Sequence, residues 1–363
     1  MSEPFSFGSK FRITVFGSSH GPHVGVEIEG CPKGLGISED EIQRELDRRK
    51  PGGSSLVSGR KEDDKLIVES GIKNGKTTGE KIRLLVKNTD AKPQHYSAFG
   101  KTPRPGHADF TSSAKYGKAQ SGGGFFSGRM TAAFVMAGAI AKKLLLARGI
   151  RTMSFARQIG SVKLVGEVTD QMILVNTYKN DVHTADMAAA KKMSAAVEKA
   201  KGVGDSIGGI VECRITGVPA GIGAPMFCSI ESSISQAIFA IPAAKGIEFG
   251  AGFAAAGMRG SEHNDAFYSK GGKVLTRTNN AGGILGGLSS GMPIVFRVAF
   301  KPTASIFMEQ ETVNLETMQQ EKLRIQGRHD PCIAIRAVSV VENVAAFCMA
   351  DILLRNEEGE HEA

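Results

Sequence analysis

Three glycine-bounded segments that carry histidine are spread along almost the whole chain, and they constrain its fold more than any other feature. They are Gly17-Ser18-Ser19-His20-Gly21, Arg104-Pro105-Gly106-His107-Ala108-Asp109 and Gly327-Arg328-His329-Asp330-Pro331-Cys332. Glycine and proline let the backbone turn sharply and approach a ligand closely, as the loops of active sites do. We therefore expect the fold to bring these distant segments together in one composite site.

Length and composition indicate a globular protein with a large core. The chain has 363 residues, 41% of them hydrophobic, and no domain boundary is visible. We expect a single domain over residues 1–363, with a frayed acidic tail at about 356–363. The longest apolar stretches, such as Thr131 to Ile140, are shorter than the ~20 residues of a membrane helix, and the N-terminus lacks the apolar core of a signal peptide. A cytoplasmic protein without a membrane partner is predicted.

The cysteine pattern does not predict a framework of disulfide bonds. They are odd in number, widely spaced and free of any CxxC pair, so neither disulfides nor a metal site is expected. Buried free thiols are the expectation for Cys31, Cys213, Cys228, Cys332 and Cys348.

The net charge of +8 predicts an anionic partner. Basic residues are interspersed with acidic ones, as in Lys61 to Lys65, and no nucleic-acid motif accompanies them. A polyanionic small molecule is therefore favoured over nucleic acid, although a basic nucleic-acid-binding protein remains the rival from another class.

Hydrophobic periodicity predicts a mixture of strands and helices. Alternation indicates strands at 11–15 and 81–86. Ser38 and Glu41 form a capping box that opens a helix over 39–49, which Pro51 and Gly52 end. Further helices are expected at 129–148, 184–201, 230–240 and 338–354. Without a strict βαβα rhythm, an α+β fold is favoured over a doubly wound sheet.

Taken in order, several segments resemble the chorismate synthase family over nearly the whole chain. They read FGSSHG at 16–21, DRRKPG at 47–52, RPGHAD at 104–109, KYG at 115–117, KGIEFG at 245–250, NNAGGI at 279–284, KPT at 301–303 and GRHDPC at 327–332. The resemblance implies a β-α-β sandwich, with helices between antiparallel sheets, and a homotetramer.

The resemblance also implies an activity. Members of the family are carbon-oxygen lyases that eliminate phosphate from 5-enolpyruvylshikimate 3-phosphate in the anti sense and so form chorismate, the last step of the shikimate pathway towards the aromatic amino acids. They require reduced FMN although the reaction has no net redox change. Some relatives reduce the flavin themselves with NADPH. No added reductase segment is visible here, so an external flavin reductant is expected.

Substrate and flavin together carry two carboxylates and two phosphates, which a buried site must pair with cations. Arginine matches such groups with two parallel hydrogen bonds. The resemblance implies substrate-binding roles for Arg48, Arg49, Lys50, Arg60, Arg104 and Arg129. The alternative for the cluster at 48–50 is an ordinary solvated helix end, where cations favour the helix dipole.

Three ionisable residues are implied to be catalytic. His20 would lie near the leaving phosphate and supply a proton and positive field, and His107 would lie by the flavin and stabilise its reduced anion. Asp330 matches the carboxylate that helps the flavin N5 take the C6 proton. The alternatives are hydrogen-bonded structural histidines and, for Asp330, a turn before Pro331. The other histidines are expected to be structural: His23, His95, His183, His263 and His329.

The flavin site is implied to be formed by Phe125, Phe126, Ser127, Pro242, Ala243, Gly286, Lys301, Pro302, Thr303, Ala304, Ser305 and Arg328. No metal is expected. Phe125 and Phe126 depart from the family, which carries polar residues there, so they either pack on the isoalloxazine face or join the core. Lys50 and Ser55 each replace an arginine. A paralogue that binds FMN or an anion with impaired catalysis is therefore the alternative function.

Overall fold

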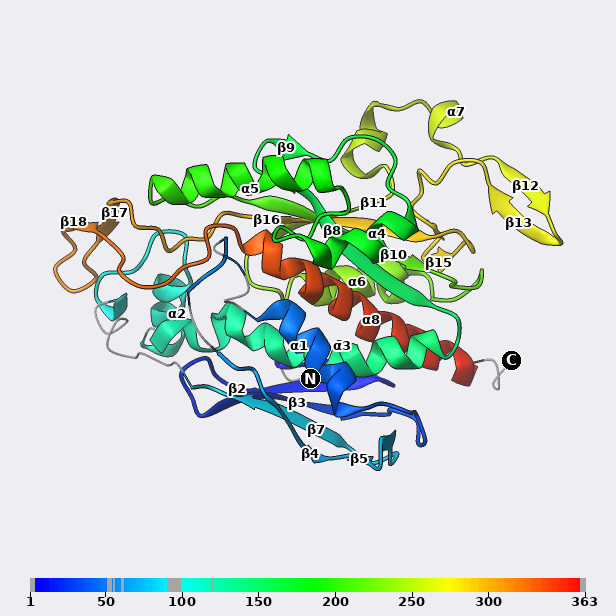
Figure 1. Cartoon of the computed structure of the whole chain (residues 1–363), viewed down its shortest axis with the longest axis horizontal. Helices are drawn as coiled ribbons and strands as arrows, with labels where there is room; N and C mark the ends of the chain where they lie inside the picture. The colour runs from blue at the N-terminus through cyan, green and yellow to red at the C-terminus, as the bar shows by residue number, and fades with distance from the viewer. Residues whose placement is uncertain are drawn as a thin grey trace.

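The computed structural model describes residues 4–50, 54, 56–59, 62–89, 99–118 and 121–359. Within these residues, two five-stranded antiparallel sheets enclose a layer of helices (Figure 1). This arrangement confirms the predicted α+β sandwich. The first sheet has the order β1-β2-β3-β7-β4 and the second β11-β16-β10-β8-β9.

The strands have the following bounds. Those of the first sheet are β1 (Ser6–Phe7), β2 (Arg12–Gly17), β3 (His23–Glu29), β4 (Leu66–Ser70) and β7 (Ile82–Lys87). Those of the second are β8 (Arg151–Ile159), β9 (Val162–Lys163), β10 (Gly209–Thr216), β11 (Ala244–Phe249) and β16 (Ile294–Phe300). Two-stranded pairs are formed by β5 (Ile72–Lys73) with β6 (Lys76–Thr77), β12 (Phe267–Lys270) with β13 (Lys273–Thr276), β14 (Ile284–Leu285) with β15 (Leu288–Ser289), and β17 (Gln310–Val313) with β18 (Gln320–Leu323).

Alternation of side chains gives each large sheet one face towards the helices. In β16, Ile294, Phe296, Val298 and Phe300 are buried, whereas the residues between them are partly exposed. In β2, Ile13 and Val15 are buried in the same alternating way. The core therefore lies on the inner faces of both sheets.

The helices between the sheets are α1 (Glu39–Arg49), α3 (Thr131–Leu146), α6 (Ile230–Ile238) and α8 (Ile333–Gly359). Helix α3 packs on β2, β3 and β7 of the first sheet, and α8 packs on β8 and β10 of the second. The predicted capping box of α1 is confirmed, because the Ser38 hydroxyl accepts from the Glu41 amide and the Glu41 carboxylate accepts from the Ser38 amide. The expected stop at Pro51 and Gly52 lies outside the described residues.

Helix α8 is longer than predicted, and most of it is buried. It extends five residues before and five residues after the predicted 338–354, so the tail is helical as far as Gly359. In the described part of the chain, α8 alone is long and apolar enough to span a membrane, contrary to expectation, but 94% of its most apolar window is buried inside the fold. A helix covered on all sides shows no polar stripe, and this absence obscured its limits in the sequence.

Close contact between α3 and α8 depends on a glycine. A Cβ atom built on Gly138 would lie 2.3 Å from Cβ of Asn343 and 2.5 Å from its carbonyl oxygen. Asp351 of α8 also joins the layers, because its Oδ1 accepts from the backbone amides of Ser9, Lys10 and Phe11 at 2.7–3.0 Å. The helical layer is thus fixed to the first sheet by both packing and hydrogen bonds.

The other predicted helices differ slightly at their ends. The 129–148 prediction corresponds to α3, which starts at Thr131 because Arg129 belongs to a 3₁₀ turn at Gly128–Met130. The 184–201 prediction corresponds to α5 (Met187–Gly202), whose N-cap is Asp186. The 230–240 prediction corresponds to α6, which ends at Ile238.

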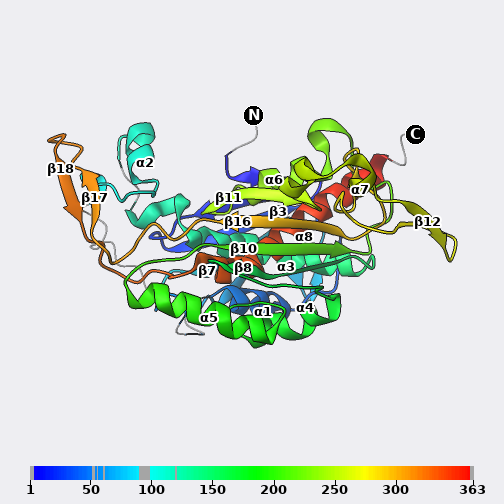
Figure 2. The same ribbon diagram turned by 90° about the horizontal axis from the view of Figure 1, so that it is seen from above.

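Smaller elements surround this sandwich. Helix α5 packs beside β8 and β9, and α4 (Asp170–Asn176) also packs on β8. Helix α2 (Asp109–Tyr116) and the β17-β18 hairpin lie at one end of the molecule, and the β12-β13 hairpin projects from the other, near α7 (Gly260–His263) (Figure 2).

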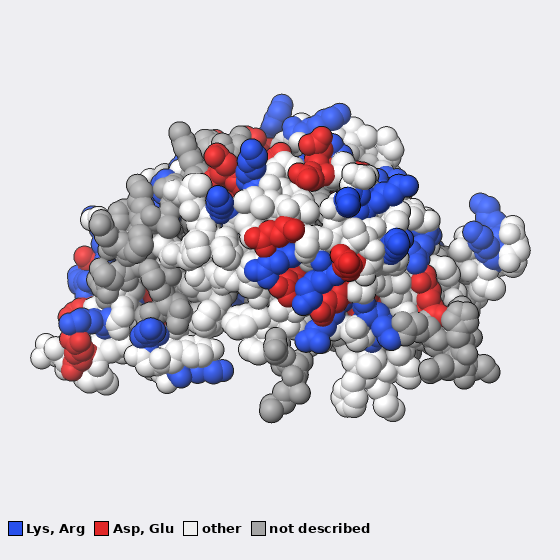
Figure 3. Space-filling view, turned by 90° about the horizontal axis from the view of Figure 1, so that it is seen from below, with Lys and Arg blue, Asp and Glu red and all other residues white. Residues whose placement is uncertain are grey.

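The surface charges are largely paired on the outer face of the first sheet, where basic and acidic side chains lie side by side (Figure 3). Lys81 forms ion pairs with Glu27 and Glu29, and Arg83 with Glu27 and Glu69. This mixture agrees with the interspersed charges of the sequence, and the described residues form no continuous basic patch on this face.

The prediction of buried free thiols is confirmed for four of the five cysteines. All five are free, and Cys31, Cys213, Cys332 and Cys348 are buried. Cys228 is exposed, because it ends a surface 3₁₀ turn at Met226–Cys228.

Replacing Gly138 by alanine should destabilise the protein, because the added methyl group collides with the α8 backbone. Such overpacking costs about 1–3 kcal/mol of unfolding free energy. Gly202→Ala is the matched control, since its Cβ would meet no atom within 4 Å. Denaturant unfolding of both variants measures the difference. An unchanged midpoint for Gly138→Ala would show that the two helices are less tightly packed than described.

Candidate functional site

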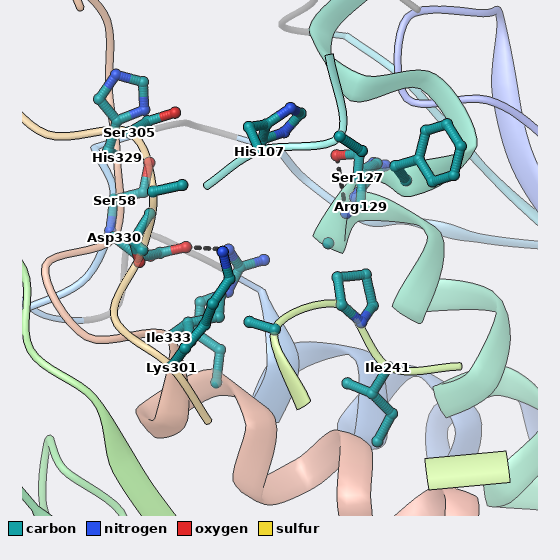
Figure 4. Close-up of a pocket in the computed structure, with 18 of the residues that line it drawn as sticks. Ser58, His107, Ser127, Arg129, Ile241, Lys301, Ser305, His329, Asp330 and Ile333 are labelled. Atoms are coloured by element: carbon teal, nitrogen blue, oxygen red, sulfur yellow. Dashed lines mark hydrogen bonds and ion pairs between the residues drawn. The ribbon is translucent and has the colours of Figure 1, made fainter. Parts of the chain in front are cut away.

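A cavity of about 580 Å³ opens at one end of the helical layer. Its wall includes His20, His107 and Asp330, so all three histidine-bearing segments meet there. The last residue of α1, Arg49, and the first residue of α8, Ile333, also line it. In Figure 4, Asp330 and Ser58 lie across the hollow from Ser127 and Arg129, with His107 between them.

Most of the predicted site residues line this cavity. They are His20, Arg49, Arg104, His107, Phe125, Phe126, Ser127, Arg129, Pro242, Ala243, Lys301, Pro302, Thr303, Ala304, Ser305, Arg328 and Asp330. Three predicted residues, Arg48, Lys50 and Gly286, are not part of its wall. Arg60, Ser55 and His95 lie outside the described residues.

Arg48 and Lys50 lie outside the wall of this cavity, and their substrate-binding roles stay predictions. Successive residues of a helix point in directions about 100° apart, so only one of the neighbouring arginines can face the cavity. Arg48 pairs with Glu45 at 2.6 Å and lies over the ring of Tyr178, 4.3 Å from its centroid. Lys50 forms a partly exposed pair with Asp47 at 2.7 Å. Gly286 lies in the turn between β14 and β15.

Arg49 is a buried cation with unused hydrogen-bonding capacity. It is 1% exposed, and none of its three guanidinium nitrogens has a hydrogen-bond partner among the described residues. The Asp64 carboxylate is 3.6 Å from its Nη2 atom. Burial lowers the pKa of Arg49 to about 9, and Arg336 and Arg129 add to this effect while Asp64 opposes it. An anion in the cavity would stabilise this guanidinium.

Arg129 differs from Arg49, because its guanidinium already donates hydrogen bonds to other groups of the protein. Its Nε donates to Asn88 at 2.9 Å, its Nη2 to the Lys87 carbonyl at 3.1 Å, and its Nη1 to Asp64. Arg129 therefore contributes positive charge to the wall while also holding Asp64 in place.

His20 is held against a strip of glycines. Gly122, Gly123 and Gly124 have φ values of 56°, 84° and 50°, a left-handed conformation that favours glycine. A Cβ on Gly122 would lie 1.8 Å from Cε1 of His20. The Nδ1 atom of His20 is also 3.1 Å from the Ser19 hydroxyl. No side chain other than hydrogen would fit at position 122 while His20 keeps this position.

His107 is partly exposed and forms a cluster with two buried residues, Arg104 and Asp109. Its Nδ1 is 2.7 Å from Oδ1 of Asp109, and Arg104 donates to both Asp109 oxygens. Asp109 was quoted in the sequence motif but given no role. The available signal was its spacing, two residues after a histidine in a turn-rich segment.

Asp330 is anchored through both carboxylate oxygens. Oδ1 accepts from the Ser58 amide at 2.8 Å, and Oδ2 accepts from Nη1 of Arg336 at 2.8 Å. Ser58 and Arg336, which also line the cavity, were missed in the sequence. Arg336 lies in a helix that was predicted to start after it, so no periodic pattern pointed to it.

Phe125 and Phe126 lie at the cavity wall rather than in the main core. Both are partly exposed. Their ring centroids are 4.6 Å apart, and Phe125 also makes edge contacts with Phe5 and Tyr116 at 5.5 and 5.6 Å. An aromatic wall of this kind suits a flat ligand ring.

Two further cavity residues have lowered pKa values. Burial, with help from Arg104, lowers the pKa of His329 to about 4, so its ring is neutral at physiological pH. Burial and then the nearby Lys245 lower the pKa of Lys301. Among the described residues, no group of three or more histidine, cysteine, aspartate or glutamate side chains could hold a metal ion.

Comparison with known proteins gives one consistent result. Residues 11–354 match the family model described as chorismate synthase. Relatives named chorismate synthase include that of Korarchaeum cryptofilum, 46% identical over 355 residues and covering 97% of this chain and 98% of the relative, and that of Methanosarcina mazei, 49% identical over 351 residues and covering 96% of each. A crystal structure titled chorismate synthase superimposes with a TM-score of 0.76 at 28% identity, covering 96% of this chain and 93% of that one.

The wall position of Phe125 and Phe126 predicts small stability losses on truncation. Phe296, which is fully buried in β16, is the matched control. Phe296→Ala should cost about 3–5 kcal/mol of unfolding free energy, and Phe125→Ala or Phe126→Ala less than half of that loss. Denaturant unfolding compares the three variants. Equal losses at all three positions would mean that the two rings belong to the core.

Proposed function

Because this chain belongs to the chorismate synthase family, we propose that it eliminates phosphate from 5-enolpyruvylshikimate 3-phosphate to give chorismate, with reduced FMN as cofactor. The observation that carries the proposal is the buried Arg49 guanidinium, which donates no hydrogen bond to the described residues and lies in the same cavity wall as His20, His107 and Asp330. The reaction would make the chain a carbon-oxygen lyase of the shikimate pathway.

The charge of the cavity supports a substrate with several anionic groups. Arg49, Arg104, Arg129, Arg328 and Arg336 line it together with Lys245 and Lys301. Asp330 and Glu62 are the carboxylates among its described lining residues. A buried anion is stabilised most by guanidinium groups that are already oriented, and Arg49 meets this condition because its own helix and its burial hold it in place.

Three ionisable side chains would carry the chemistry. His20, next to Gly122, would hold a proton near the leaving phosphate and strengthen the positive field there. His107 would hold a proton beside the cofactor. Asp330, whose oxygens are fixed by Ser58 and Arg336, would keep a negative group at the place where the substrate loses its proton.

FMN fits a second set of residues in the wall. Phe125 and Phe126 would contact the flat ring, and Ser127, Pro242, Ala243, Arg328 and the segment 301–305 would hold the rest, all of them lining the cavity. Bound reduced FMN would supply electron density and a basic nitrogen to the elimination. Ala243, with a φ of 71°, keeps an uncommon backbone conformation there, as ligand-contacting residues often do.

A homotetramer in the cytoplasm is also proposed. Large apolar side chains on the surface, such as Phe227 at 92%, Phe253 at 82% and Met226 at 82% exposure, offer contact area for a homotetramer. The enzyme would work in the cytoplasm with an external flavin reductant.

The direct test is an anaerobic assay with the named substrate and chemically reduced FMN. Chorismate should form, whereas oxidised FMN without a reductant should give none. NADPH alone, added with oxidised FMN, should also give none if the reductant is external. No chorismate under reduced anaerobic conditions would contradict the proposal and favour a catalytically impaired paralogue that still binds FMN or an anion.

The same assay tests the two histidines. His20→Ala and His107→Ala should each lower turnover by about 10²-fold or more, the scale of general acid–base catalysis, while melting temperatures stay close to that of the wild type. His263→Ala is a suitable control, because His263 lies in α7 and does not line the cavity. Near-wild-type turnover of either cavity variant would remove that residue from the proposal.

A further inference from the structure

Asp109 is a buried carboxylate behind the cavity wall. It is the first residue of α2 and is 2% exposed. It does not line the cavity, but both of its bonded partners, Arg104 and His107, do. A carboxylate in this position can act on a bound ligand only through those two side chains.

The contacts occupy both carboxylate oxygens. Oδ2 accepts from Nε of Arg104 at 2.7 Å and from the Arg104 amide at 3.2 Å. Oδ1 accepts from Nη2 of Arg104 at 2.8 Å and lies 2.7 Å from Nδ1 of His107. Although burial alone would raise the pKa of Asp109, its hydrogen bonds with Arg104 and His107 hold that pKa well below its usual value.

We propose that Asp109 is a positioning residue that fixes the ring orientation and tautomer of His107 and holds Arg104 beside it. An ionised carboxylate only accepts hydrogen bonds, so Nδ1 of His107 must donate to it. The neutral ring then carries its lone pair on Nε2, which lies 3.2 Å from the donor Nη2 of Arg104 and is the ring nitrogen left to exchange a proton. This inference rests on the proposed function, because the catalytic role of His107 is part of that proposal.

The contacts distinguish this role from ordinary capping of a helix. The N-cap of α2 is Ala108, which makes no side-chain cap bond, and the described bonds of the Asp109 carboxylate go to Arg104 and His107 instead of to the amides of its own helix. Arg104 is further held by Ser305, whose hydroxyl accepts from Nη1 at 3.1 Å, and its guanidinium carbon lies 4.6 Å from the Phe99 ring centroid. Asp109 is therefore the element of this cluster that orients His107.

The kinetic test is a double-mutant cycle. Asp109→Asn should lower kcat by about 10²-fold, the scale of the general acid–base contribution that it supports. In the His107→Ala background, the same substitution should cause a much smaller loss, because only the hold of Asp109 on Arg104 then remains to be lost. Asp170→Asn is the matched control, since Asp170 is also the first residue of a helix, α4, but lies away from the cavity. Its kcat should equal that of the wild type.

A second measurement does not depend on activity. In ¹⁵N NMR spectra of histidine-labelled full-length protein, the ring signals that disappear in His107→Ala belong to His107. In the wild type they should report a protonated Nδ1 and an unprotonated Nε2, and in Asp109→Asn they should shift to a mixture of tautomers. An unchanged ring signature in Asp109→Asn, or additive kinetic losses in the cycle, would overturn the inference. Lack of chorismate formation by the wild type would instead contradict the proposed function, and the NMR comparison would still decide on Asp109.

Discussion

The burial of Arg49 beside two other arginines is the interaction on which the rest of the site depends. Arg49, Arg129 and Arg336 line one cavity, and the carboxylates of Asp64 and Asp330 pair with them only in part. Burying an arginine without full pairing is unfavourable in an empty site. The same arrangement favours an anion strongly, because the guanidinium is already dehydrated and oriented when the ligand arrives.

The sandwich makes this arrangement possible. Helices α3 and α8 start near the cavity and run side by side towards the far end of the molecule (Figure 1), so the positive ends of both helix dipoles lie near the anion site. Away from the cavity, ion pairs within the layer hold some of their buried polar groups. Lys142 of α3 pairs with Glu45 of α1 and Glu342 of α8, and these contacts keep the pKa of Lys142 raised although burial alone would lower it. Rigid packing thus holds the cavity wall in place.

The sequence predicted which segments form the site, but not the directions and contacts of individual side chains. The glycine-bounded histidine segments indicated a composite site, and the capping box at Ser38 fixed the start of α1. The direction of a side chain could not be predicted for neighbouring cations, so Arg48 was grouped with Arg49 although only Arg49 faces the cavity. The bounds of α8 were wrong because a helix buried on all sides has no polar face. The contacts of Arg336 depend on folding and left no pattern in the sequence, whereas Asp109 was signalled only by its spacing, two residues after His107.

The central claim is that Arg49 is the preformed anion receptor of this cavity. Isothermal titration of 5-enolpyruvylshikimate 3-phosphate into the wild type, Arg49→Met and Lys50→Met tests it most directly, with melting temperatures to confirm folding. We expect Arg49→Met to lose about 10- to 100-fold in affinity, corresponding to about 1.5–3 kcal/mol for a hydrogen bond to a charged group. Lys50→Met should bind like the wild type. Equal affinity of Arg49→Met and the wild type, in a folded protein, would contradict the account.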